Sequence, residues 1–315
     1  MTAKAGRRHD APPSSFPAAA TQAPTRRMLR RSTGWRLPAV PLAIALVCLA
    51  GAGLLLFPTI VSWFSQYEQS QRIDQLTHDV ADLGAETLHE RVQEARAYNA
   101  ALTGGGANIA ANERLPLADE PTPDGDYADV LRADADGLMA RLKIPSIDVD
   151  LPIYHGTSNE VLDHGVGHLE GTAVPVGGAS THSVLTAHRG LATSELFTHL
   201  DRVRLDDVFT VEVFGEVLAY RVIDTRVVEP SETEALLPET GKDLITLVTC
   251  TPLGVNSHRI LVTGERIIPT PVQDLADAGQ RPDIPTFPWW VLIAVGVILV
   301  LVLYVWLSGR PHRRP

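Results

Sequence analysis

The sequence predicts a mainly β protein, with a closed or nearly closed barrel between two membrane-spanning helices. Residues 127–268 contain short apolar and β-branched runs separated by Gly, Pro, Asn and Asp, which is the pattern of strands and turns. These runs leave little room for helices, and strands at this density favour a barrel. Outside this region, two runs of about 20 or more residues carry no charge, which is long enough to cross a bilayer core.

The two apolar runs organise the ends of the chain. Residues 1–36 are rich in Ala, Pro, Ser, Thr and Arg, so we expect a disordered tail before a first span at residues 37–64. The small residues 50–52 would suit signal-peptide cleavage, but the apolar run continues past them, which favours an uncleaved anchor. Basic residues precede this span, and a basic tail (308–315) follows a second span at 288–307. By the positive-inside rule both termini are cytoplasmic, and the rest lies outside the cytoplasm at the cell membrane.

The charge between the spans is strongly negative. About 16 basic residues face about 36 acidic ones there, a net charge of roughly −20. This argues against nucleic-acid binding, which requires a basic face. An acidic surface could favour basic partners, although such charge more often reflects only a solvated surface.

The two cysteines cannot pair with each other in this arrangement. Cys48 lies inside the first span, whereas Cys250 lies on the far side of the membrane. Cysteines outside the cytoplasm are usually paired, so an unpaired one is a candidate reactive thiol. The general alternative is a buried cysteine that acts as a small hydrophobic residue.

Residues 65–126 are expected to form a juxtamembrane helical region followed by a loop. Apolar residues recur at intervals of three and four over 66–102, which predicts an amphipathic helix with one stripe on the globular part. Gly84 is a candidate interruption that would give two helices. The loop at 103–126 is rich in Gly, Asn, Asp and Pro, and its length fits either a lid or a linker.

The barrel region at 127–268 contains seven strand candidates, and Gly215 marks a hairpin between two of them. The candidates are residues 138–144, 149–154, 183–186, 208–214, 216–228, 244–249 and 259–267. A proline-rich linker at 269–287 leads to the second span.

The strand at 244–249 ends in a candidate nucleophile, Cys250, and Pro252 blocks its continuation. Arg259 opens the next strand, so an antiparallel pair joined by the intervening turn would place Cys250 and Arg259 side by side. A guanidinium there would favour the thiolate or stabilise an oxyanion formed by its attack on a carbonyl. A surface arginine paired with a carboxylate is an equally good reading of the spacing alone.

Histidines supply the candidate acid. His188 lies just beyond the strand at 183–186, and an imidazole beside Cys250 could protonate a leaving amine; a structural or exposed histidine is the alternative. His164 and His168 have a helical metal-ligand spacing, but the glycines between them disfavour a helix, so we expect no metal site. Three further histidines are expected to flank the candidate site and could orient substrate: His155, His182 and His258.

Several motifs in order resemble the sortases, cysteine transpeptidases of the Gram-positive cell surface, and their class C or pilus-assembling branch in particular. The TLVTC run at 246–250, with Arg259 downstream and His188 upstream, is the signature of this family. The further matching stretches are LPIYHG at 151–156, GVGHLEG at 165–171, LTAHRG at 185–190 and CTPLGVNSHR at 250–259.

The resemblance, which runs from about residue 98 to 268, implies an eight-stranded sortase-type barrel with N-terminal helices packed on it. It also implies that Cys250 is the nucleophile, His188 the general acid/base and Arg259 the electrostatic stabiliser. The implied partners are pilin precursors with a C-terminal Leu-Pro-x-Thr-Gly-like signal, cleaved through a thioester and joined to a lysine amine of another pilin. No metal or organic cofactor is expected.

The same residues are compatible with other functions. A sortase that attaches single proteins to the wall would use a peptidoglycan amine in place of a pilin lysine. A non-catalytic scaffold that binds sorting signals is a rival from another class, and the intact Cys250, His188 and Arg259 argue against it. A surface adhesin would need repeats or a stalk composition, which the sequence lacks.

Two stretches depart from the family pattern. The class C lid commonly carries an Asp-Pro-aromatic motif. Residues 103–126 contain Asp119-Glu120-Pro121 but no Asp-Pro followed by an aromatic residue, so the sequence does not show how a lid would be anchored over the cysteine. Residues 237–241 (LPETG) read as a sorting signal within the enzyme itself. They run straight into the catalytic strand rather than into an apolar span, so we interpret them as a turn.

Overall fold

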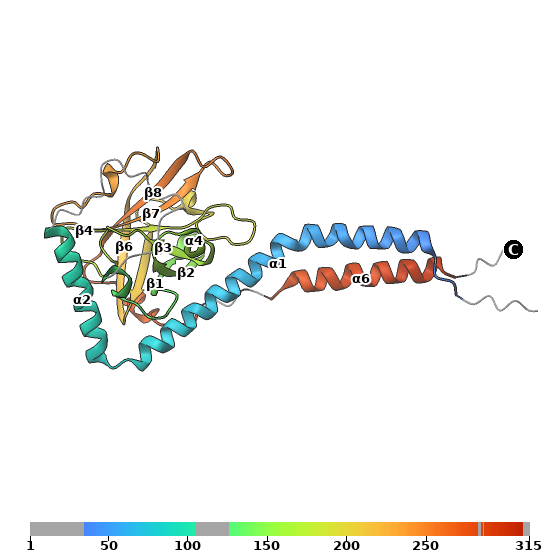
Figure 1. Ribbon diagram of the computed structural model, residues 1–315, viewed down its shortest axis with the longest axis horizontal. Coiled ribbons are helices and arrows are strands. Elements are labelled where there is room, and N and C mark those ends of the chain that lie inside the picture. The colour runs from blue at the N-terminus through green and yellow to red at the C-terminus, as the bar shows by residue number, and fades with distance from the viewer. Residues whose placement is uncertain (1–34, 105–125, 283–284, 286, 311–315) are drawn as a thin grey trace, which may run out of the picture.

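A computed structural model describes residues 35–104, 126–282, 285 and 287–310 of the chain (Figure 1). The candidate lid loop at 103–126 lies almost wholly outside the described residues. The helices are α1 (Ala39–Asp82), α2 (Ala85–Gly104), α3 (Asp126–Asp129), α4 (Asn159–His164), α5 (Val272–Ala276) and α6 (Trp289–Ser308). The strands are β1 (Leu138–Ile144), β2 (Val149–His155), β3 (Val166–His168), β4 (Thr181–Thr186), β5 (Val208–Val213), β6 (Glu216–Val228), β7 (Asp243–Thr251) and β8 (His258–Arg266). Short 3-10 turns are η1 (Pro145–Ile147), η2 (Leu200–Arg202) and η3 (Glu234–Leu236).

The eight strands form a closed barrel in the order β1-β2-β3-β4-β7-β8-β6-β5, and β5 pairs with β1 to close it. Two neighbouring pairs are parallel, β2 with β3 and β4 with β7, and the other pairs are antiparallel. The interior is filled by buried apolar side chains, among them Phe209, Tyr220 and Ile245. The expectation of an eight-stranded barrel is therefore confirmed.

β3 is the strand that the sequence pattern did not predict. It has three residues with Gly167 at its centre, so it has neither the length nor the β-branched composition of a strand signal. A side chain at Gly167 would lie 2.4 Å from the carbonyl oxygen of Gly156, which explains why this position has none. Pairing with β2 and β4 on either side makes this segment a strand.

The two N-terminal helices wrap the barrel as their periodicity predicts. α1 ends at Asp82, and α2 begins at Ala85 after Leu83 takes an extended conformation, so the predicted interruption beside Gly84 is confirmed. Ile73 on α1 is fully buried and Ala95 on α2 packs into the barrel core. In Figure 1, α1 runs along one side of the barrel and α2 returns along another.

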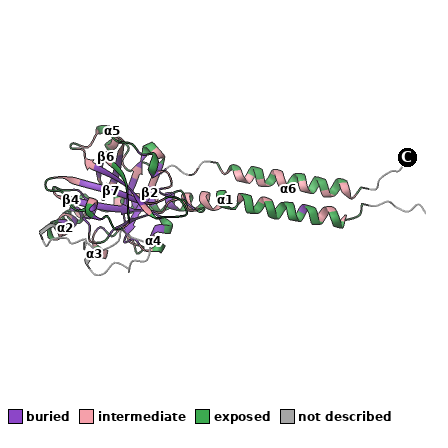
Figure 2. Ribbon diagram, turned by 90° about the horizontal axis from the view of Figure 1, so that it is seen from above, coloured by how far each residue is buried: buried purple, intermediate pink, exposed green. Residues whose placement is uncertain are grey.

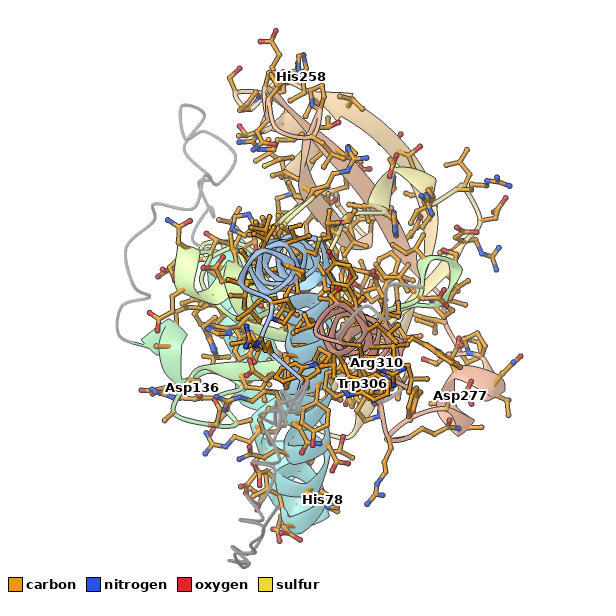
Figure 3. All side chains as sticks on the ribbon, turned by 90° about the vertical axis from the view of Figure 1, so that its right-hand side faces the viewer. His78, Asp136, His258, Asp277, Trp306 and Arg310 are labelled. Carbon is orange, nitrogen blue, oxygen red and sulfur yellow. The ribbon has the colours of Figure 1, made fainter. Side chains whose placement is uncertain are left out.

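The first part of α1 and the whole of α6 are long and apolar enough to cross a membrane. They lie side by side away from the barrel, and most of their residues are exposed (Figure 2). At their ends, the Trp35 indole N–H donates to the carbonyl of Trp306 at 3.1 Å. The Arg310 guanidinium lies 3.6 Å from the Trp306 ring centroid (Figure 3), a cation–π contact at the end of α6.

The linker to α6 is held against β1. Arg141, which is buried, binds the carboxylate of Asp150 through two 2.6 Å bonds and donates to the carbonyl of Gln280 at 2.7 Å. Lys143 donates to the carbonyl of Asp277 at 3.0 Å. The composition predicted only a proline-rich linker, whereas the structure has one turn of helix in it, α5.

Candidate active site

Cys250 and Arg259 are directly paired residues of β7 and β8. The predicted side-by-side placement is therefore confirmed. β7 is longer than predicted, because it continues through Cys250 and ends at Thr251, which pairs with His258. Pro252 still prevents further pairing. Cys250 is therefore the second-last residue of β7 and lies within the strand rather than beyond it.

His188 reaches the same place from β4. The parallel pairing of β4 and β7 runs as far as Thr186 with Val248, and the same register continued by two residues would place His188 beside Cys250. Two bonds extend the contact beyond the strand: the Ala187 N–H donates to the Val248 carbonyl at 3.2 Å, and the Thr249 hydroxyl donates to the Ala187 carbonyl at 2.7 Å.

Cys250 and Arg259 share the outward face of the barrel wall. Ile245 and Leu247 of β7 point into the core, so alternation places Cys250 on the opposite face. Arg259 lies on that face of β8 for the same reason, since Ile260 and Val262 point inward. The structure thus brings Cys250 and Arg259 together, and the bonds of Ala187 to Val248 and Thr249 hold the residue before His188 against β7.

Cys250 is a free cysteine, and the residue is neither buried nor fully exposed. Arg259 beside it is only 1% exposed. Its Nη1 donates to the carbonyl oxygens of Asn256 at 2.9 Å and His258 at 3.0 Å. Its Nε and Nη2 are buried without a hydrogen-bond partner among the described residues. A positive group with two open donors next to a thiol can stabilise a thiolate or an oxyanion.

His188 is partly buried, and its Nε2 lies 3.9 Å from the Asp163 carboxylate. Burial lowers the pKa of His188 below its ordinary value, and the charge of Asp163 opposes that shift. Asp163 was not predicted as a site residue. It lies on α4, and no local pattern connects that helix to the strand that carries His188.

Arg189 is a second residue that the sequence reasoning did not single out. Its guanidinium donates to the Thr251 hydroxyl at 2.9 Å and to the Thr198 carbonyl at 3.1 Å, and it pairs with Asp201 at 3.0 Å. The bond to Thr251 ties the residue after His188 to the residue after Cys250. Its position inside the LTAHRG motif, directly after His188, could have indicated that Arg189 belongs to the site.

Gly190 closes this loop tightly against the β7–β8 turn. It has a φ of +73°, in the region that favours glycine, and a side chain there would meet Leu253 Cδ2 at 2.3 Å. The loop after His188 and the turn after Cys250 therefore pack on each other.

Of the three histidines expected to flank the site, His258 does so, since it pairs with Thr251 and lies at the start of β8 (Figure 3). His182 lies at the far end of β4, within hydrogen-bond distance of the Thr246 hydroxyl (2.7 Å) and the Leu237 carbonyl (3.0 Å). The Nδ1 of His155 lies 2.8 Å from the Gly137 carbonyl oxygen, and its Nε2 lies 2.7 Å from the Val130 carbonyl oxygen. The last two are held by the scaffold, so their expected place beside the nucleophile is wrong.

His164 and His168 do not share a face. His164 ends α4, whereas His168 is on β3, with its Nδ1 2.7 Å from the Tyr127 hydroxyl and its Nε2 2.9 Å from the Ala173 carbonyl. Across the described residues, the structure has no group of three His, Cys, Asp or Glu side chains placed to hold a metal ion.

Burial of His168 predicts acid sensitivity of the fold. Burial lowers the pKa of His168 from 6.5 to about 4, so it stays neutral in the folded chain while the unfolded chain takes up the proton. Stability should be unaffected by this group above pH 6.5 and fall between there and pH 4, by about 3 kcal/mol in total. Urea unfolding at several pH values should show this slope in the wild type, weakened in His168→Gln and retained in His89→Gln, which changes an exposed histidine. An unchanged slope in His168→Gln would contradict the prediction.

The LPETG stretch lies at the opposite end of β7 from Cys250. All five residues are exposed, and Thr240 and Gly241 form a turn, as interpreted from the sequence. The Lys242 N–H donates to the Glu239 carbonyl at 3.1 Å within that turn. At about 3.3 Å per residue, the length of β7 keeps these residues away from the nucleophile of the same chain.

A cavity of about 700 Å³ lies elsewhere, between α1, the α3–β1 connection and α4, and it is lined by residues such as Gln69, Arg132 and His155. None of Cys250, His188 and Arg259 lines it. We place the candidate active site at Cys250, because the nucleophile and its charged neighbours are there.

Comparison with known proteins agrees with this site. The sortase domain model matches residues 142–267, which include Cys250, His188 and Arg259. Sortase D of Bacillus subtilis (strain 168) is 30% identical over 132 residues, 40% of this chain and 62% of that protein. Sortase SrtE1 of Streptomyces coelicolor is 32% identical over 143 residues, 41% of this chain and 40% of that protein. The chain therefore spans less than two thirds of the length of these curated relatives.

Solved structures match over more of the chain. Sortase C-1 from Actinomyces oris is 48% identical with a TM-score of 0.52, covering 58% of this chain and 98% of that one. Sortase C1 of GBS Pilus Island 1 is 41% identical with a TM-score of 0.55, covering 64% and 94%. Sortase C of Streptococcus pneumoniae, described together with its pilin substrate specificity, is 40% identical with a TM-score of 0.56, covering 62% and 96%. The chain belongs to the sortase family of cysteine transpeptidases, and the solved structures it matches are class C sortases.

Proposed function

We propose that this chain is a membrane-anchored pilus sortase, which cleaves the sorting signal of one pilin precursor and joins it to a lysine of another. The observation that carries the proposal is the pairing of Cys250 with Arg259, whose buried guanidinium has two nitrogens without partners in the part of the chain that the structure describes. The pilin substrate is supported by the class C sortases of Streptococcus pneumoniae and Group B Streptococcus, which match this chain.

In the first half-reaction, the Cys250 thiolate attacks the threonine carbonyl carbon of a Leu-Pro-x-Thr-Gly-like signal. Arg259 holds the oxyanion of the tetrahedral intermediate through its open N–H groups. When the intermediate collapses, the Thr–Gly bond breaks, and His188 gives its proton to the leaving glycine amine. The products are a thioester on Cys250 and a released peptide that begins with glycine.

In the second half-reaction, a lysine amine of another pilin attacks the thioester carbonyl. His188, now neutral, takes the excess proton from that amine, and Cys250 leaves as the thiolate. The new bond is an isopeptide bond between the threonine and the lysine. The site is thereby returned to its starting protonation, and no metal or organic cofactor takes part in the steps.

For location, we propose that residues 37–64 and 288–307 both cross the cell membrane. Basic residues at the outer ends of both spans favour cytoplasmic termini, with the barrel outside. This arrangement places Cys250 on the side where pilins are assembled.

The proposal is tested by incubating the full-length protein in detergent micelles with Leu-Pro-x-Thr-Gly peptides and measuring its intact mass. We expect a covalent adduct of the peptide through threonine on the wild type and none on Cys250→Ala. Addition of a lysine-bearing pilin fragment should then remove the adduct and produce the isopeptide-linked product.

Two other results would change the assignment. Release of the adduct by a peptidoglycan-type amine but by no pilin lysine would favour a sortase that attaches single proteins to the wall. If several peptides that differ at position x all bind without forming an adduct, the result would contradict transpeptidation and favour a binding scaffold.

A further inference from the structure

Gln69 connects the membrane-anchoring helix to the candidate active site. It lies on α1 just beyond the first apolar run, and only 6% of it is exposed. Its side-chain Nε2 donates to the carbonyl oxygen of His164 and to the hydroxyl of Ser194, both at 3.2 Å. A buried amide that bonds two distant segments fixes their positions relative to α1.

The first acceptor fixes α4. His164 is the last residue of this six-residue helix, whose C-terminal carbonyls lack partners within the helix. So short a helix is marginal without external contacts. Asp163, the residue before His164, carries the carboxylate that faces His188 at 3.9 Å. A shift of α4 would therefore move Asp163 relative to His188.

The second acceptor fixes the loop that follows His188. Ser194 is 2% exposed and forms a β-bridge with Leu191. Three residues later, the Phe197 N–H donates to the carbonyl of His188 itself at 3.1 Å. The loop thus turns back on His188, and Ser194 is the point at which α1 holds it.

We propose that Gln69 is a positioning residue for His188, so that the juxtamembrane part of α1 belongs to the active-site scaffold. It acts through α4 and Asp163 on one side of His188, and through Ser194 and the loop on the other side. The charged group that faces His188 is Asp163 from α4, and Cys250 on β7 and its pair Arg259 on β8 lie where the register of β4 and β7 leads. The adjacent Arg189 is directed to Thr251 and Asp201. The activity readout rests on the proposed function, whereas the titration of His188 does not.

The experiment uses the full-length protein in detergent micelles with labelled histidine, so that NMR follows the titration of His188. Gln69→Met keeps the length of the side chain and removes both bonds, and Gln75→Met is the matched control on an exposed position of the same helix. Ser194→Ala removes one bond without changing α1. Asp163→Asn removes the facing charge directly.

We expect Gln69→Met to move the His188 titration to lower pH, in the direction that Asp163→Asn moves it, because Asp163 raises the pKa of His188. The kcat for thioester formation should fall about tenfold with KM unchanged, since small misplacements of a catalytic group slow the chemical step. Gln69→Met combined with Asp163→Asn should be no slower than the slower single variant, because the loss at Asp163 is already part of the loss in Gln69→Met. Ser194→Ala should lower kcat without moving the titration, and Gln75→Met should match the wild type.

An unchanged His188 titration and an unchanged kcat in Gln69→Met would overturn the inference, as would losses that are fully additive with Asp163→Asn. If Gln69→Met fails to fold, an unchanged kcat in Ser194→Ala overturns it instead. If the wild type forms no thioester, the proposed function is wrong, and the titration alone then decides the role of Gln69.

Discussion

Replacing Arg259 with methionine is expected to slow thioester formation by about 10²–10³-fold while raising the melting temperature of the protein. The loss of rate is the size measured when one donor to a developing oxyanion is removed from an enzyme. The gain in stability follows from the burial of the guanidinium, which is 1% exposed and has two nitrogens without partners among the described residues. A buried charge whose donors are only partly paired destabilises the folded state, and methionine fills similar space without the charge.

A slower reaction together with a higher melting temperature distinguishes a role in catalysis from a role in holding the fold. Arg259→Lys should recover part of the rate, because it restores a point charge but not the planar fork of donors. Arg221→Met, at an exposed position on the neighbouring strand β6, is the matched control and should leave both rate and melting temperature near wild type. Pre-steady-state kinetics measure the rate of thioester formation, and thermal unfolding measures the melting temperature. A variant that lost rate and stability together would show that Arg259 supports the fold rather than the oxyanion.

Replacing His188 with glutamine is expected to lower the rate on a peptide substrate by about 10²–10⁴-fold, the range for loss of a general acid. A peptide releases an amine, which needs a proton as it leaves. An activated ester with the same acyl part releases a group that needs none. His188→Gln should therefore recover most of the wild-type rate on the ester.

The pH dependence of the rate is a second test of the acid role of His188. The acid form of His188 is lost as pH rises through its pKa, which burial lowers and Asp163 partly restores. The rate on the peptide should therefore fall at higher pH, and Asp163→Asn should move that fall to lower pH. Stopped-flow measurement of product release across pH values checks both statements. Equal losses of His188→Gln on peptide and ester would contradict the acid role and indicate a role in forming the thiolate.

The strands were predictable wherever the signal was local. β1 and β6 have the predicted bounds, because apolar runs closed by turn residues define them within one stretch of chain. β3 was missed because three residues around a glycine carry no such signal, and only its neighbours on either side make it a strand. The break between α1 and α2 was visible because Gly84 interrupts a regular period.

For the candidate site, the meeting of Cys250 and Arg259 was predictable from the sequence, since a short turn between two strands constrains their register, and the pairing of β7 with β8 confirms it. The packing of whole elements decided that the residues leading to His188 lie against β7, because β4 and β7 are parallel and their contacts join residues 62 positions apart. It also decided the contact of Gln69 with Ser194, across 125 positions. Such contacts depend on how whole elements pack, and a pattern within one segment carries no record of which distant segment will lie against it.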